Sequence, residues 1–294
     1  PPPPAGANVS LIPYMLGGLT KDYQKEDPTE YRFDAGGDAK IAITSSLNLD
    51  LTVNPDFSQV EVDVQQTNLD RFELFFPERR QFFIENGDLF SNFGYSRIRP
   101  FFSRRIGLDA PIFFGARLSG KLNKNWRIGV MDMQTGKNEA GVPAQNFGVV
   151  ALQRQVFARS NITGIFINKQ TFDYEAAVND HENLTRYNRN LGFEYNLASS
   201  NNIWRGKLLY LRSFTAGAGG NDQVIAGNLD YNSTHWRIGM QYDFIGEDYN
   251  AEVGFVPRTG LHRLNPGIGY LFFPKSSFVL SHGPYAETEL FFDT

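Results

Sequence analysis

The chain has 294 residues and a net charge of -4, from 28 basic and 32 acidic side chains. This balance excludes the strongly basic surface that nucleic-acid binding requires. The lack of cysteine excludes disulfides and thiolate chemistry, and no uncharged apolar run is long enough for a membrane-spanning helix. Aromatic residues make up 14% of the chain, a load that suits the interfacial girdles of a membrane barrel.

The chain begins with a run of proline. Pro1–Pro4 is preceded by neither an initiator methionine nor a signal peptide. We therefore expect residues 1–8 to be the end of a stiff, proline-rich linker from an upstream domain that is missing here.

Apolar and polar residues alternate along most of the remaining chain. In Leu47–Val53 the leucines and Val53 fall on one face, and Asn48, Asp50 and Thr52 on the other. A period of two residues predicts strands with one apolar and one polar face. The predicted strands are Val9–Leu19, Tyr31–Thr44, Leu47–Val53, Ile112–Leu122, Trp126–Gln134, Asn146–Phe157, Ile162–Lys169, Arg186–Ala198, Ile203–Phe214, Gln223–Tyr231, Trp236–Ile245, Glu252–Val256, Arg263–Phe273, Ser277–His282 and Tyr285–Phe292.

Tight and long connections between these strands alternate as far as Ile245. Two-residue and other short turns rich in Asn and Ser alternate with long loops, as in barrels with short periplasmic turns and longer outer loops. A soluble β-sandwich shares the residue alternation. Strand lengths near 9–11 residues, tryptophans close to strand ends and the persistent loop parity favour the barrel. The alternation of apolar and polar residues is imperfect in Asn146–Phe157 and Ile203–Phe214. Gly129 and Gly192 fall on the polar faces of their strands, where small residues relieve crowding inside a barrel.

The connection Asn54–Pro111 is far too long for a plain loop. Val60–Val64 could form a short strand, and Pro77 suits the first turn of a helix that continues through Glu85 and stops at Gly87. If the amino terminus is periplasmic, the alternation of tight and long connections places both ends of this insertion on the extracellular side. We expect it to fold into the lumen as a plug or to cap the extracellular mouth.

The insertion also carries the residues of a family resemblance. The run LDLTVNPDFSQVEVDVQQTNLDRFELFFPERRQFFIENGDLF, with RPFFSRRIGL and GARLSGKL after it, resembles a Bacteroidota outer-membrane barrel family catalogued as a domain of unknown function. The resemblance is strong over Leu11–Gln170. It implies a signal peptide and an upstream domain similar to family-9 carbohydrate-binding modules. Barrels of this kind finish on a terminal aromatic, whereas this chain ends on Asp293–Thr294, so we expect further strands to be missing.

Charged residues of the insertion are the candidate site residues. The candidate catalytic carboxylates are Glu61, Asp63, Glu73, Glu78 and Glu85. The candidate binding or plug network is Arg71, Arg79, Arg80, Asp88, Arg97, Arg99, Arg104 and Arg105. A glycosidase needs two carboxyls at a defined separation, one of them with a raised pKa. Neighbouring arginines lower carboxylate pKa values, so a salt-bridge network that fixes the insertion to the barrel wall is the preferred interpretation.

The four histidines, His181, His235, His262 and His282, are scattered without ligand spacing, so we expect no metal site and no cofactor. Ser281–His282 is a poor catalytic pair, because adjacent strand residues point to opposite faces.

These observations predict an all-β protein, an antiparallel transmembrane β-barrel with about fourteen strands in this chain and a plug-like insertion. We expect residues 9–294 to form the barrel, in the outer membrane of a Gram-negative bacterium. The expected function is to bind or pass a polar, carbohydrate-related solute, and its carbohydrate element comes from the resemblance alone. Expected partners are outer-membrane lipid, a polar glycan or oligosaccharide, and other outer-membrane proteins, with no nucleic acid. A glycan hydrolase that uses the insertion's carboxylates, and a structural subunit of an outer-membrane complex, are the alternatives.

Overall fold

A computed structural model describes residues 8–21, 30–55, 67–69, 71–108, 110–138, 141–174, 185–217, 219–275 and 278–294. Strands make up most of this part of the chain. They are β1 (Val9–Thr20), β2 (Glu30–Thr44), β3 (Leu47–Val53), β4 (Ile112–Lys121), β5 (Trp126–Thr135), β6 (Gln145–Val156), β7 (Ser160–Thr171), β8 (Tyr187–Ala198), β9 (Trp204–Thr215), β10 (Gln223–Asn232), β11 (Trp236–Ile245), β12 (Leu261–Tyr270), β13 (Tyr285–Glu287) and β14 (Leu290–Asp293).

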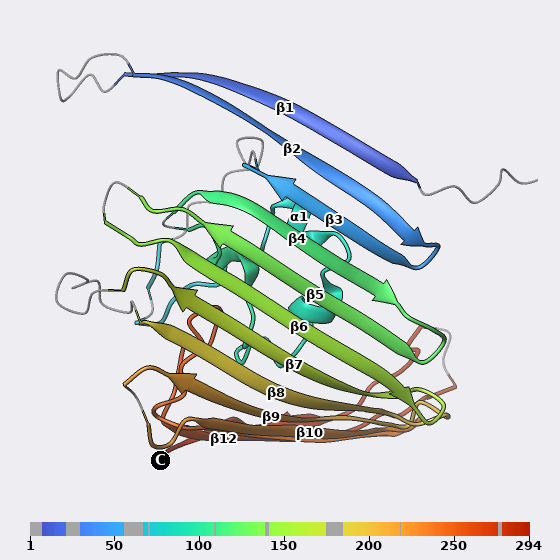
Figure 1. Cartoon of the computed structure of the whole chain (residues 1–294). Coiled ribbons are helices and arrows are strands. Elements are labelled where there is room, and N and C mark those ends of the chain that lie inside the picture. The colour runs from blue at the N-terminus through green and yellow to red at the C-terminus, as the bar shows by residue number, and fades with distance from the viewer. Residues whose placement is uncertain are drawn as a thin grey trace, which may run out of the picture.

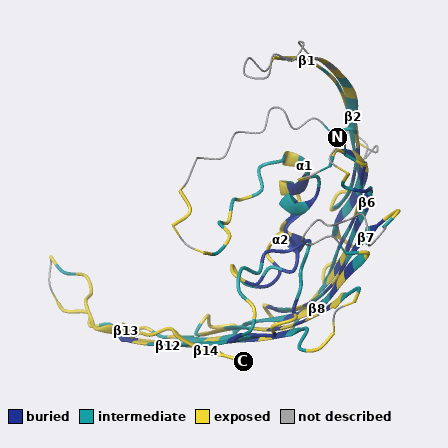
Figure 2. Cartoon of the chain, turned by 90° about the vertical axis from the view of Figure 1, so that its left-hand side faces the viewer, coloured by how far each residue is buried: buried dark blue, intermediate teal, exposed yellow. Residues whose placement is uncertain are grey.

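The strands form one 14-stranded antiparallel sheet in chain order (Figure 1). Each strand from β1 to β12 pairs with the next, and β14 also pairs with β12. The sheet curls around the insertion, but β1 and the last strands do not meet within the described residues (Figure 2). The predicted all-β antiparallel class and the count of about fourteen strands are therefore confirmed, in a sheet that is curved but not closed.

Several predicted elements after Ile245 are wrong. Glu252–Val256 is not a strand, and its Phe255 forms a single bridge with Arg99 of the insertion. In the described part of Ser277–His282, only His282 is bridged, to Phe272. Tyr285–Phe292 is divided into β13 and β14, which both pair with β12. These segments contact the insertion or one neighbouring strand, so the alternation of apolar and polar residues in them does not correspond to a continuous strand of the sheet.

The insertion contains less helix than predicted. α1 is only Gln81–Ile84, and α2 (Asp88–Ser91) comes after it, with one 3-10 turn, η1 (Ser103–Arg105), further on. The Glu78 carboxylate accepts the backbone N–H groups of Arg79 and Arg80, which keeps this stretch extended and delays the helix to Gln81. Neither α1 nor α2, the α-helices of the described residues, is long or apolar enough to cross a membrane. The predicted strand Val60–Val64 lies outside the described residues.

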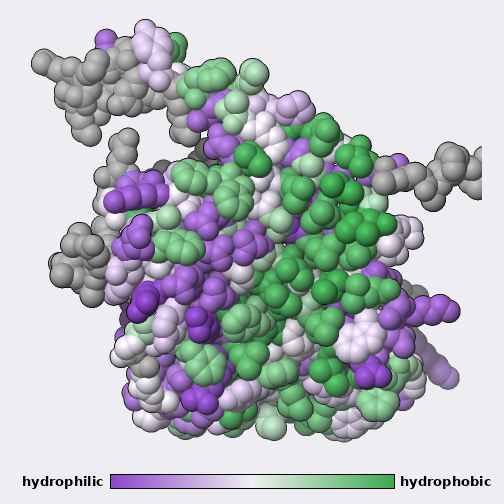
Figure 3. Space-filling view, viewed as in Figure 1, coloured by the Kyte–Doolittle hydropathy of each residue, from purple (hydrophilic) through white to green (hydrophobic). Residues whose placement is uncertain are grey.

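The convex face of the sheet carries exposed apolar side chains over its centre and its tight-turn half, while polar side chains gather at the long-loop end (Figure 3). The exposed apolar residues include Val150, Leu152, Phe166, Phe193, Leu208, Tyr210, Ile225, Leu229, Ile238, Met240 and Ile268. Near the tight turns, aromatic rings pair across strands. The ring centroids of Trp204 and Tyr231 are 4.9 Å apart, and those of Trp236 and Tyr270 are 4.8 Å apart.

The concave face of the middle strands is also apolar, because the insertion covers it. The buried wall residues are Met131, Met133, Phe147, Val149, Ile165, Ile167, Leu209, Leu211 and Val224. They form one core with insertion residues Phe83, Leu89, Phe90, Phe93, Ile98, Phe101 and Ile106. The strands of this region therefore carry apolar residues on both faces, which explains why the alternation in Asn146–Phe157 and Ile203–Phe214 is imperfect.

Candidate functional site

The described residues of the insertion from 71 to 108 lie on the concave side of the sheet (Figure 2). Two wall glycines allow the close approach. A Cβ at Gly129 would lie 2.6 Å from Phe90 Cζ, and a Cβ at Gly192 would lie 2.9 Å from Phe93 Cε1. Both phenylalanines are almost fully buried. The insertion is therefore in direct packing contact with β5 and β8.

Polar contacts also join the insertion to the wall. The Gly94 backbone N–H donates to Glu194 Oε2 at 2.7 Å, and Lys207 Nζ donates to the Gly94 carbonyl at 2.6 Å. The Tyr95 hydroxyl donates to Asn228 Oδ1 at 2.9 Å. Because the two charged wall residues satisfy both backbone groups of one glycine, the insertion is fixed in position as well as packed.

Glu78 stabilises the insertion internally. Its carboxylate binds the Arg80 guanidinium, at 2.9 Å to Nε and 2.7 Å to Nη2, and accepts the Ser103 hydroxyl at 2.7 Å. Arg80 also donates to the carbonyls of Ser103 and Ile106. Burial acts to raise the pKa of Glu78, but the hydrogen bonds and positive charge of Arg80, with the Ser103 hydroxyl, hold that pKa below its usual range.

Glu85 joins α1 to the wall. It forms an ion pair with Lys40 of β2, and it accepts the Gln81 side-chain amide at 2.5 Å. The hydrogen bond from Lys40 is the main reason that the pKa of Glu85 is lowered, with further contributions from Gln81 and from the charge of Arg117. Both carboxyls are thus held in the ionised form.

A cavity of about 810 Å³ lies between this part of the insertion and the first strands. We call it the β2–β4 hollow. Its charged lining residues are Asp38, Lys40, Asp50, Glu78, Arg79, Glu85 and Arg117. The insertion packs against the middle of the sheet and leaves this space beside the first strands, so the concave side of the sheet is filled unevenly.

Asp50 and Arg117 form the most buried ion pair of the hollow. Arg117 Nη2 lies 2.6 Å from Asp50 Oδ2, with side chains 1% and 5% exposed, and Arg117 also donates to the Phe82 carbonyl of α1. Lys40, Asp50 and Arg117 stand in register on neighbouring strands, which places alternating charges in one row. Strand register creates this row, so the row could not be recognised from the sequence alone.

Three predicted site residues, Glu78, Glu85 and Arg79, line the hollow, and the other described ones do not. Glu61 and Asp63 lie outside the described residues. Elsewhere, Glu73 pairs with Arg105 at 2.5 Å, Asp88 with Arg127 at 2.8 Å, and Arg97 with Glu289 at 3.5 Å. Arg99 lies over the Phe75 ring, Arg71 over Phe72, and Arg104 over Phe76, where it also donates to the Pro77 carbonyl. The candidate arginines are thus spread over the insertion and do not form one cluster.

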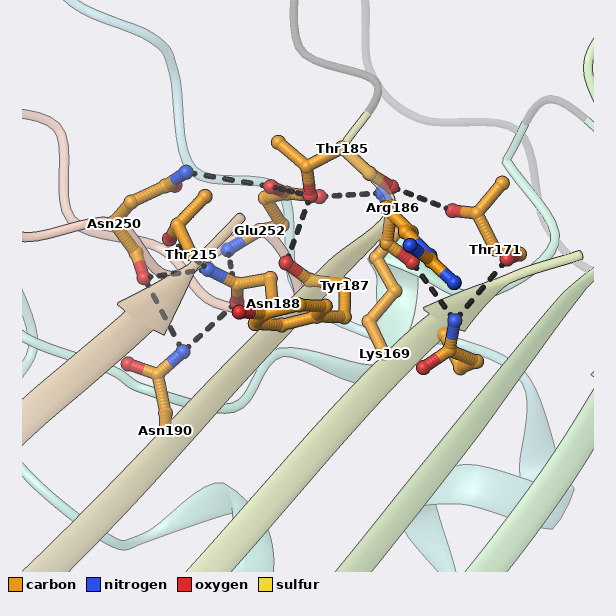
Figure 4. A network of polar contacts seen from close by, with 11 residues as sticks. Lys169, Thr171, Thr185, Arg186, Tyr187, Asn188, Asn190, Thr215, Asn250 and Glu252 are labelled. Carbon is orange, nitrogen blue, oxygen red and sulfur yellow. Dashed lines mark hydrogen bonds and ion pairs between the residues drawn. The ribbon is translucent and has the colours of Figure 1, made fainter. Parts of the chain in front are cut away.

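A second polar system, which sequence reasoning did not identify, lies near the long-loop end (Figure 4). Lys169 Nζ is 2.6 Å from Glu252 Oε2, with side chains only 9% and 6% exposed. Glu252 Oε1 also accepts the Thr185 hydroxyl at 2.6 Å, and Asn188 and Asn190 donate to the Asn250 carbonyl. These contacts hold the connection after β11 against the ends of β7 and β8. The sequence feature that could have indicated this polar system is Lys169, a charged residue at an inward-facing position of β7.

Near the tight-turn end, the inner wall is polar and hollowed. One cavity of about 390 Å³ lies between the insertion and β5–β9, and another of about 440 Å³ is lined by residues of β10–β13. Lys207 lines the first and Asn228 the second, and these two residues are paired across β9 and β10. The inner surface is therefore polar from β5 to β12 at this end. Within the described residues, no group of three or more His, Asp or Glu side chains is placed to hold a metal.

Comparison with known proteins gives a partial family match. Residues 5–125 match the model of a family described as a domain of unknown function (DUF5916). No curated protein matches the chain. Among solved structures, the chain is similar to the crystal structure of Pseudomonas aeruginosa OpdL, with 11% sequence identity and a TM-score of 0.37, over 97% of this chain and 81% of that one.

Proposed function

We propose that this chain belongs to an outer-membrane β-barrel protein that binds or passes a small polar solute. The observation that carries the proposal is the contrast between the two faces of one curved sheet. The convex face exposes a continuous set of apolar side chains, whereas the concave face holds charged and polar cavities around the insertion.

The exposed apolar face supports a lipid neighbour. Soluble monomers rarely expose apolar patches of more than a few hundred Å². Here such side chains follow one another across β6–β12, and paired aromatic rings lie at one border, as in the girdles of membrane barrels. At the other border the outward residues become polar, and Asn146 donates to Asp132 at 3.1 Å. An apolar band between an aromatic and a polar border suits a bilayer.

The loop pattern supports the orientation. The tight turns between β2 and β3, β4 and β5, and β6 and β7 are all at one end of the sheet, and the longer connections are at the other (Figure 1). In outer-membrane barrels short turns face the periplasm. Because β1 starts at the tight-turn end, the amino terminus is periplasmic in this proposal.

The insertion acts as a plug that leaves a side path. Its core with the middle strands fills one part of the lumen, and the β2–β4 hollow remains beside it with a charged lining. A lining of this kind suits a polar solute. The carbohydrate element of the proposal rests on the resemblance to the Bacteroidota barrel family, whose members usually carry a family-9-like carbohydrate-binding domain.

Hydrolysis is less well supported than binding. A glycosidase acid requires a raised pKa, whereas the pKa values of Glu78 and Glu85 are both lowered. Both carboxylates are also occupied by cationic partners. This arrangement suits a structural role for the pair.

Thiol labelling tests the membrane proposal directly, because the chain has no cysteine of its own. Leu208→Cys and Met240→Cys place thiols on the convex face, and Asn228→Cys places one on the concave face. In proteoliposomes, we expect a water-soluble maleimide to modify Asn228→Cys and to modify the other two only after detergent is added. Equal labelling of all three in intact liposomes would refute the membrane assignment.

Solute passage is measured in the same liposomes. We expect swelling in isotonic glucose or glucosamine to be faster with the protein than in protein-free liposomes. A folded, bilayer-inserted protein that leaves the swelling rate unchanged refutes passage and leaves binding as the function.

A further inference from the structure

We propose that a cavity of the insertion binds a small aromatic carboxylate, with the ligand's ring among phenylalanine side chains and its carboxylate on Arg99. We call this space, of about 250 Å³, the aromatic cavity. Its apolar walls are Phe75, Phe83, Phe90, Phe101, Phe102 and Met131. The site is independent of the proposed function, because it assigns a ligand to the insertion itself and requires neither passage through the barrel nor a bilayer.

The aromatic cavity has a buried floor and an accessible mouth. Phe83, Phe90 and Phe101 are buried, whereas Phe75 and Ile84, which also line the cavity, are 39% and 54% exposed. The volume exceeds the roughly 150 Å³ of an apolar protein cavity that binds benzene. A ligand with one ring can therefore enter past Phe75 and Ile84 and pack against the floor.

The walls suit an aromatic ring because their own rings are inclined to one another. The ring centroids of Phe75 and Phe102 are 5.1 Å apart at an interplanar angle of 33°, and those of Phe90 and Phe101 are 5.8 Å apart at 59°. Inclined rings present both edges and faces to the space between them. An aromatic ligand there gains edge-to-face contacts in addition to the burial of its apolar surface.

Arg99 offers free donors at this cavity. Its Nε donates to the Ser96 carbonyl at 3.3 Å, and its Cζ lies 4.5 Å from the centroid of the Phe75 ring. Nη1 and Nη2 have no hydrogen-bond partner among the described residues, and neither is enclosed away from solvent. A guanidinium that stacks on a ring keeps its edge available, and two N–H groups of that edge fit one carboxylate.

The other charged residues that line the aromatic cavity are matched. Glu78 pairs with Arg80, and Arg117 pairs with Asp50. No carboxylate of the described chain pairs with Arg99, so the lining keeps one positive charge. Burial lowers the pKa of Arg99, and a partly buried cation attracts an anion more strongly than a fully solvated one does. An apolar space beside a single unpaired guanidinium matches a ligand with one ring and one carboxylate.

Calorimetry on the full chain in detergent tests the site, with each probe also titrated into protein-free detergent. The probes are benzoate, which is anionic at pH 7, benzyl alcohol, which keeps the ring but carries no charge, and acetate, which keeps the charge but has no ring. We expect benzoate to bind about tenfold or more tightly than benzyl alcohol, as a charge-assisted contact provides. Acetate should bind more than about tenfold more weakly than benzoate, because it leaves the aromatic cavity unfilled.

Two substitutions separate the ring from the charge. Arg99→Gln should reduce the preference for benzoate over benzyl alcohol to near equality. Phe75→Leu should weaken both ligands by about threefold, through the loss of one aromatic contact, and keep the preference. Arg154→Gln is the matched control, since Arg154 of β6 also lies over an aromatic ring, with its Cζ 5.3 Å from the ring centroid of Trp126, but does not line the cavity. It should bind all three probes as wild type does.

Several results would overturn the site. They are no binding of benzoate by folded wild type, equal binding of benzoate and benzyl alcohol, and acetate binding as tight as that of benzoate, which would place an anion on the protein without use of the cavity. A preference for benzoate that persists in Arg99→Gln or disappears in Arg154→Gln, or unchanged benzoate affinity in Phe75→Leu, would overturn it too. If Arg99→Gln does not fold, the wild-type comparison and Phe75→Leu still decide.

Discussion

A methyl group added at Gly129 or Gly192 should separate the insertion from the wall. In Gly129→Ala the new Cβ meets Phe90 Cζ at 2.6 Å and Phe90 Cε1 at 2.9 Å. In Gly192→Ala it meets Leu211 Cδ2 at 2.7 Å, as well as Ile165 and Phe93 at 2.9 Å. Ordinary van der Waals contact begins near 3.4 Å, so the buried side chains that each new Cβ meets must shift by several tenths of an ångström.

The two opposing contributions can be ranked. In a strand, replacing glycine by alanine reduces the backbone entropy lost on folding and stabilises by about 0.5–1 kcal/mol. Overfilling a well-packed core costs about 1–3 kcal/mol. Phe90 and Phe93 are 2% and 3% exposed, which leaves them little room to rotate away. We therefore expect a net loss of about 1–2 kcal/mol in the free energy of unfolding for each substitution.

Gly164→Ala is the control, because its Cβ would meet the Phe193 ring at 3.7 Å, an ordinary contact. It should be neutral or slightly stabilising. Urea unfolding of the detergent-bound protein measures all three variants, and limited proteolysis reports exposure of residues 71–108. If Gly129→Ala and Gly192→Ala are as stable and as protease-resistant as Gly164→Ala, the insertion does not pack against β5 and β8 as described.

Three further outcomes are expected. Lys169→Met should lower the free energy of unfolding by about 3–5 kcal/mol, because it leaves the buried Glu252 carboxylate without its cation. An unchanged urea midpoint would contradict the pairing of Lys169 with Glu252. Arg127→Gln should lower the free energy of unfolding by less than about 1 kcal/mol, because its partner Asp88 is half exposed and water screens the ion pair. A larger loss would show that water screens this pair less than its exposure indicates. The pKa of Glu78 is lowered from 4.5, so on acidification the unfolded chain takes up a proton first, and stability should fall as pH decreases below about 4.5. Urea unfolding at pH 3.5 and 6.5 should show this loss in wild type and a smaller one in Glu78→Gln.

Strand positions were predictable because a period of two is a local property of the sequence. Leu47–Val53 and Trp236–Ile245 were predicted with the bounds that β3 and β11 have. Loop parity also held through Ile245, because turn chemistry is local. After β12 the connection at the tight-turn end is long, from residue 271 to 284, and the parity ends there.

The site was less predictable because register and burial decide it. Glu78 and Glu85 were predicted as candidate site residues from their charge, but their contacts with Ser103 and Lys40 join positions that are far apart in the sequence and meet only in the folded chain. The buried Lys169–Glu252 pair could not be predicted either, because its two residues lie 83 positions apart in the sequence and no local pattern connects them.

The contacts of the insertion also constrain the order of assembly. Neighbouring strands join residues that are close in the chain, whereas Gly94 binds Glu194, Tyr95 binds Asn228 and Arg105 binds the Gly254 carbonyl, at separations of 100, 133 and 149 residues. Contacts of long sequence separation form late, because the loop entropy must be overcome first. During synthesis the insertion precedes most of the wall that it covers. Hairpin pairing can therefore proceed strand by strand, while residues 71–108 dock only after β8–β10 are in place, and their phenylalanines stay exposed to chaperones until then.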